Sequence, residues 1–140
     1  MLPVDPDVLA LKAAALERHL VRVDERLAEA PETLRPLDDV TDSVVLHLWQ
    51  AVQVVLDLGV SWATRAGLAP QGYGDAFRRL ARARLLDEGL ARRLASAAGF
   101  RNRVVHQYEE LDLDVVVRVA REGPADLRAF LRVLRDQLPP

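Results

Sequence analysis

The segment that most constrains the fold is VVLHLWQAVQVVLDLGVSWA, residues 44–63, the most apolar run of the chain. Four polar residues interrupt this run: His47, Gln50, Gln53 and Asp57. Such side chains would be costly in the hydrocarbon of a bilayer, so a membrane span is not expected. A helix that is apolar on most of its faces is instead buried by other protein. We therefore expect residues 38–65 to form a central helix around which the rest of the chain packs.

The remaining periodic segments also predict helices, and no segment has the alternation that is typical of a strand. Asp5 followed by Pro6 marks the start of a first helix, which should continue to about Pro31. A loop that holds Pro31 and Pro36 then leads to the central helix. The other expected helices are 76–84, capped by Asp75; Asp87 or Glu88 to about Tyr108, weakened at Gly99; and Asp112 to about Leu138, broken or kinked at Gly123–Pro124.

These helices predict one all-α bundle of five or six helices in a single domain, residues 1–140. The chain has no cysteine, which excludes disulfides and thiolate zinc sites and suits a reducing cytoplasm. Its first twenty residues lack the basic and apolar regions of a signal peptide, so export is not expected.

The charge is distributed unevenly along the chain. The formal net charge is -2, which argues against a general nucleic-acid binder. Residues 75–106 nevertheless contain eight arginines against three acidic residues. The segment RNRVVHQY, residues 101–108, ends this basic stretch and concentrates residue types that can act on phosphate.

The residue types of this segment suit RNA cleavage without a metal. Histidine has an unperturbed pKa of about 6.5, so His106 can move protons at a ribose hydroxyl or a leaving oxygen. The planar guanidinium of Arg101 matches phosphate oxygens, and Asn102 can orient a phosphate or the imidazole. On an ideal helix Arg101 and His106 lie about 140° apart, so they share no face. Three arrangements would bring them together: the reach of the arginine, a local distortion of the helix, or a partner helix across a two-fold axis. We expect the third, with two copies of each residue around one groove.

The spacing Arg101, four residues, His106, one residue, Tyr108 resembles the R-x4-H-x-Y signature of the HepT toxins in the HEPN superfamily. Asn102 matches the polar residue that commonly follows the arginine of that signature. The likeness extends over AGFRNRVVHQYEELD and, more loosely, over the helix order.

The resemblance implies a HEPN-type bundle, a homodimer with its cleft between protomers, and metal-independent endoribonuclease activity of Arg101 and His106 on an RNA substrate. It implies no cofactor. It also implies a partner, a minimal nucleotidyltransferase (MNT) antitoxin that silences the toxin by transferring AMP to Tyr108. On an ideal helix Tyr108 lies within about 20° of Arg101, so the phosphate of that AMP is expected to reach the same chain's guanidinium.

Other interpretations of these residues remain open. Basic side chains in the last turn of a helix complement its macrodipole, which is a purely structural role for Arg101, Asn102 and His106. If these residues cleave nothing, the whole chain is a non-catalytic HEPN binding module, a partner subunit of a nucleotidyltransferase, or a structural helical dimer. Three further arginines are RNA contacts or part of a solvated face: Arg92, Arg93 and Arg103. We expect His19 and His47 to be structural, because no metal-ligand spacing links the histidines.

Overall fold

A computed structural model describes residues 2–30 and 33–140, and its secondary structure in these ranges is entirely helical. Pro31, where the first helix was expected to end, lies outside the described residues. The elements are α1 (Pro6–Glu29), α2 (Asp39–Arg65), α3 (Tyr73–Arg82), α4 (Glu88–His106), the one-turn 3₁₀ helix η1 (Tyr108–Glu110) and α5 (Leu113–Asp136). The prediction of an all-α bundle is confirmed.

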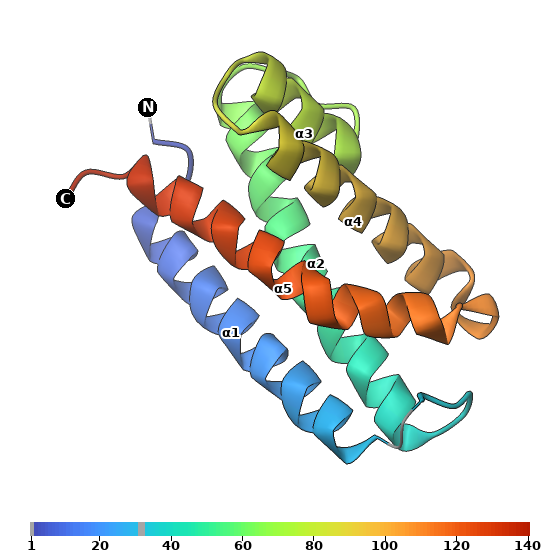
Figure 1. Cartoon of the computed structure of the whole chain (residues 1–140). Helices are drawn as coiled ribbons and strands as arrows, with labels where there is room; N and C mark the ends of the chain where they lie inside the picture. Colours follow the sequence, from blue (N-terminus) through green and yellow to red (C-terminus); the bar gives the residue numbers. More distant parts are fainter. Residues whose placement is uncertain (1, 31–32) are drawn as a thin grey trace.

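The helix α2 lies at the centre of the bundle and contacts α1, α3, α4 and α5 (Figure 1). Among the described residues α2 alone is long and apolar enough to cross a membrane, yet 56% of that apolar window is buried inside the structure. Its neighbours therefore cover the apolar surface, as the composition of residues 44–63 predicted. Because α2 touches every other long helix, its polar residues can reach side chains that are far away in the sequence.

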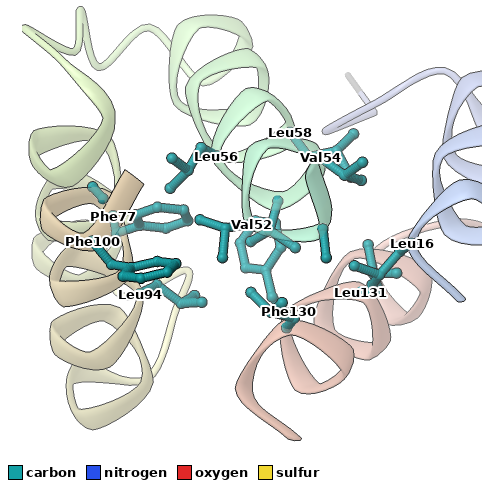
Figure 2. Packing of buried hydrophobic residues seen from close by; sticks show 14 of the residues in the cluster. Leu16, Val52, Val54, Leu56, Leu58, Phe77, Leu94, Phe100, Phe130 and Leu131 are labelled. Carbon is teal, nitrogen blue, oxygen red and sulfur yellow. The ribbon is translucent and has the colours of Figure 1, made fainter. Parts of the chain in front are cut away.

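The core has an aromatic centre that joins three helices (Figure 2). Phe77 of α3 meets Phe130 of α5 edge to face, with ring centroids 5.5 Å apart, and both rings are fully buried. Gly59 of α2 leaves room for this pair, since a Cβ atom added there would lie 2.6 Å from Cε1 of Phe77. Trp62 packs against Phe130 at 6.0 Å between centroids, which places this tryptophan in the core.

The start of α1 follows its local capping signal, whereas the start of α3 does not. The carboxylate of Asp5 accepts hydrogen bonds from the amides of Asp7, at 2.8 Å, and Val8, at 3.4 Å, as the Asp-Pro signal predicted for α1. The start predicted for α3 was wrong, because that helix begins at Tyr73. Asp75 lies within its first turn and accepts from the amide of Gln71 instead of capping the helix.

The break or kink expected at Gly123–Pro124 was wrong as a break, since α5 is helical from Leu113 to Asp136. An internal proline costs a helix about 3 kcal/mol. Burial on both sides of Pro124 outweighs this cost: Val116 and Ala120 are buried before it, and further buried residues follow at helical spacing. In α4 the helix likewise continues through Gly99, so burial of the neighbouring residues outweighs the cost of this glycine as well.

Candidate functional site

The predicted motif lies where α4 ends. The helix stops at His106, two residues before the expected end, because Gln107 leaves the helical conformation with φ -140° and ψ 39°. Tyr108 then begins the 3₁₀ turn η1. Arg103 and His106 are the basic residues of the last turn of α4, so they also complement its macrodipole.

Arg101 is half-buried and held by side chains of two other helices. Its Nε donates to Oε1 of Gln53 in α2 at 3.0 Å, and its guanidinium carbon lies 5.3 Å from the ring centroid of Tyr73 in α3. Gln53 in turn donates to the Tyr73 hydroxyl at 3.1 Å and to the carboxylate of Asp57 at 2.8 Å. Two helices thus orient the guanidinium, and its Nη1 donates outward to Oδ1 of Asn102 at 3.2 Å.

His106 lies apart from this network. Its side chain is exposed, as are those of Asn102 and Arg103. Within the described residues no hydrogen bond joins Asn102 to His106, so the amide accompanies the arginine rather than the imidazole. One chain therefore presents a held guanidinium and an open imidazole at different places on the end of α4.

Tyr108 points away from Arg101. Its hydroxyl donates to Oδ1 of Asp42, in the first turn of α2, while Arg101 binds Gln53 of the same helix. These two α2 residues are eleven positions apart, about 16 Å along a helix axis. The expected alignment of Tyr108 with Arg101 was wrong, because Tyr108 belongs to η1 rather than to α4. The phosphate of one AMP on Tyr108 would therefore lie beside Asp42 and not on the Arg101 guanidinium of its own chain.

The surroundings of Tyr108 disfavour its ionised form. Partial burial, the hydrogen bond to Asp42 and the negative charge of that carboxylate together raise the pKa of Tyr108 to about 12. A cavity of about 380 Å³ adjoins the pair, with walls that include Leu37, Val45 and Leu111. Tyr108 as a whole remains 42% exposed.

The other predicted arginines have different surroundings. Arg92 lines a groove of about 600 Å³ between α3 and α4, together with Arg78 and Arg82. Arg93 instead pairs with Asp126 of α5, with 2.9 Å between Nε and Oδ1. On an ideal helix Arg92, Arg103 and His106 lie within about 60° of one another, so one face of α4 connects the groove to the motif.

His19 of α1 and His47 of α2 meet with 3.1 Å between their Nδ1 atoms. Burial is the main cause that lowers the pKa of both side chains below its ordinary value, and nearby arginines add to the effect. Over residues 2–30 and 33–140 no group of three or more metal-ligating side chains is present. The pair joins α1 to α2, and both histidines are far from residues 101–108 in the sequence.

Three residues of the site were not predicted as such: Asp42, Gln53 and Tyr73. Gln53 was visible as a polar residue in an apolar helix, but nothing in the spacing tied it to Arg101. Asp42 is an acidic residue in the first turn of α2, where such charges are common, so nothing in the sequence marks it as part of the site.

Comparisons with known proteins agree on one family. The family described as ribonuclease HepT-like matches residues 16–134. The mRNA nuclease HepT of Shewanella oneidensis is 28% identical over 133 residues, which cover 94% of this chain and 98% of the relative. A solved structure of a tri-AMPylated Shewanella oneidensis HEPN toxin in complex with MNT antitoxin matches with a TM-score of 0.83 and 28% identity, covering 94% of this chain and 99% of that chain. A crystal structure of a toxin–antitoxin with AMP-PNP matches with a TM-score of 0.82 and 28% identity, covering 93% of this chain and 98% of that chain.

Proposed function

Because the chain belongs to the HepT-like ribonuclease family, we propose that it is a metal-independent endoribonuclease and the toxin of a toxin–antitoxin pair, acting in the cytoplasm. The observation that carries this proposal is the end of α4, where Arg101 is held in place and the side chain of His106 is exposed. A guanidinium and an imidazole are the two groups that phosphodiester cleavage without a metal requires. The degree of match to ribonuclease relatives over 94% of the chain supports the same reaction.

In the proposed reaction His106 moves a proton at the ribose hydroxyl or at the leaving oxygen. Arg101 stabilises the negative charge that builds up on the phosphate oxygens. Its Nε and Nη1 are engaged by Gln53 and Asn102, which leaves Nη2 to donate to the phosphate. A guanidinium already held by the fold needs no rearrangement when the charge develops.

The cleft is proposed to form between two protomers. Asp42 and Gln53, the α2 partners of Tyr108 and Arg101, are three turns apart, so Leu46 lies between them on the same face of α2. Leu46 is 47% exposed, and Val105, between Arg101 and Tyr108 in the sequence, is 44% exposed. The proposed interface would cover the apolar surface that these two side chains leave in solvent near the site. A two-fold axis there brings Arg101 of one protomer toward His106 of its partner.

We propose that RNA approaches along the groove between α3 and α4. Arg78, Arg82 and Arg92 line this groove with positive charge, and Arg103 continues the same face of α4 toward His106. Arg93 already pairs with Asp126, so we give it a smaller role in phosphate binding. Binding through phosphates should weaken steeply as the salt concentration rises.

A nucleotidyltransferase antitoxin is the proposed partner, and AMP transfer to Tyr108 is the proposed means of silencing. The solved structure of a relative in complex with MNT antitoxin is tri-AMPylated, and Tyr108 of this chain is partly exposed. The modification places an anion and a nucleoside beside the proposed interface. It would therefore silence the toxin by obstructing the cleft.

Incubation of the purified, unmodified protein with total RNA in EDTA tests the proposal. The wild type should cleave, whereas Arg101→Ala and His106→Ala should lose cleavage by a factor of about 10² or more. Arg132→Ala, a change of an exposed arginine of α5, should cleave like the wild type. Strict dependence on a divalent ion contradicts the mechanism, and RNA binding without cleavage identifies a binding module instead.

A further inference from the structure

The hydroxyl of Tyr108 donates a hydrogen bond to Asp42. No motif of the sequence predicts this contact. The two residues are 66 positions apart, and the side chain of Tyr108 reaches from η1 to the first turn of α2. Glu109 and Glu110 are closer in sequence, but within the described residues neither side chain hydrogen-bonds to the Tyr108 hydroxyl. Among the described residues it is the carboxylate of Asp42 that accepts a hydrogen bond from the hydroxyl of Tyr108.

A tyrosine in this setting is a weak nucleophile unless a base assists it. With a pKa of about 12, only about one Tyr108 side chain in 10⁵ is ionised at neutral pH. The hydroxyl already donates its proton in a hydrogen bond to the carboxylate of Asp42. The proton therefore has one acceptor already in place when the hydroxyl reacts.

We propose that Asp42 is the general base for nucleotidyl transfer to Tyr108, so that the toxin supplies part of the machinery of its own silencing. This inference rests on the proposed modification of Tyr108. It assigns to the toxin chain a catalytic residue that contacts the reacting oxygen atom. The partner then has to supply the nucleotide and the groups that bind its phosphates.

The step balances with ATP as the donor. The oxygen of Tyr108 attacks the α-phosphorus and forms a new phosphorus–oxygen bond, while the bond from that phosphorus to the oxygen bridging to the β-phosphate breaks. Pyrophosphate leaves with the electron pair of the broken bond. The phenolic proton moves to the Asp42 carboxylate along the existing hydrogen bond and passes from there to solvent.

A carboxylate at this position is better suited than a neutral acceptor to take the proton of Tyr108 during the reaction. As the new bond forms, the phenolic oxygen loses electron density and its proton becomes more acidic. A carboxylate is a much stronger base than an amide, so the proton can transfer during the attack rather than before it. An asparagine at position 42 would keep an acceptor near the oxygen but would not take the proton.

The test follows AMP incorporation into the full chain by intact mass, using the nucleotidyltransferase partner and ATP. The variants are Asp42→Asn and Asp42→Ala, and the matched control is Asp39→Asn, an exposed acid in the same first turn of α2. Loss of a general base should slow incorporation by about 10²-fold in both Asp42 variants and leave the control unchanged. In Asp42→Asn the rate should also rise about tenfold per pH unit from about pH 7 to about pH 9, because hydroxide replaces the lost base.

The outcomes separate this inference from the proposed function. If wild type and Asp42→Asn gain AMP at the same rate, Asp42 is not the base, although the modification stands. If Asp42→Ala alone is slow, Asp42 only positions the ring. A wild type that gains no AMP overturns the modification and the inference together. Independently of any partner, ultraviolet titration of Asp42→Asn should show that the pKa of Tyr108 falls from about 12 toward its ordinary value; an unchanged value overturns the contact.

Discussion

Nε of Arg101 lies 3.0 Å from Oε1 of Gln53, although 48 residues separate them in the sequence. The contact couples the last turns of α4 to the middle of α2. It makes Gln53 a positioning residue for the guanidinium, since the same amide also bonds Tyr73 and Asp57.

The first prediction concerns this contact. Gln53→Leu should lower the rate of RNA cleavage roughly ten- to hundredfold, because a misplaced guanidinium stabilises the phosphate charge poorly. The loss should appear in kcat more than in KM. Gln50→Leu in the same helix is the control. Equal activity of Gln53→Leu and wild type would show that the network is only structural.

A second prediction tests the proposed interface. Val105→Glu should weaken dimerisation by about 3 kcal/mol or more, roughly a hundredfold in dissociation constant, because a carboxylate would be buried between protomers. Light scattering measures the effect, and RNA cleavage should fall with the dimer. Leu11→Glu is the matched control, since Leu11 is 73% exposed on α1. A Val105→Glu protein that remains dimeric places the interface elsewhere.

A third prediction concerns the core. Gly59→Ala should lower the free energy of unfolding by about 1–3 kcal/mol, because its Cβ would lie 2.6 Å from the buried ring of Phe77. Gly99→Ala should do the opposite and stabilise by about 0.5–1 kcal/mol, since its Cβ finds ordinary contact at 3.6 Å with the Arg103 guanidinium. Urea unfolding of both variants checks the two signs, and a shared sign would contradict the packing described here.

A fourth prediction is that His19 and His47 make stability depend on pH. Their pKa values are lowered in the folded chain, chiefly by burial, so the unfolded chain binds protons more readily. Their contribution to stability is complete above the ordinary histidine pKa of about 6.5. It should be lost as the pH falls from about 6.5 toward the lower pKa values of the folded state.

Urea unfolding near pH 7.5 and near pH 5.5 measures this dependence. The double variant His19→Gln, His47→Gln should show a smaller drop between the two conditions than the wild type. His106→Gln is the control, because that imidazole is exposed at the end of α4. A double variant with the full drop would assign the effect to carboxylates.

Local patterns were sufficient to predict the helices. The apolar run of α2 and the Asp5-Pro6 signal of α1 act within a few residues, so they can be recognised in one sequence. The end of α4 was predicted two residues too late: Gln107 leaves the helical conformation, and the side chain of Tyr108 then bonds Asp42 of α2, a contact that no local pattern encodes.

The chemistry of the site was only partly visible in the sequence. Arg101, Asn102 and His106 are neighbours in one segment, and their residue types indicate phosphate chemistry. The partners that hold them, Gln53 for Arg101 and Asp42 for Tyr108, come from α2 and depend on how the helices pack. Periodicity tells which face of a helix is buried but not which polar residues of two helices meet.

The helix α5 contains a weak point in its hydrogen-bond ladder. The ring nitrogen of Pro124 has no hydrogen, so the carbonyl of Ala120 lacks the amide that an ordinary helix offers. The half after the proline is tied to α1, where Arg128 donates to Glu17 at 2.9 Å. In hydrogen–deuterium exchange, amides of residues 113–123 should therefore open locally and exchange faster than those of residues 125–136. The two halves of this continuous helix should therefore open separately. The half that opens more readily is the one that follows Tyr108 and η1 in the chain.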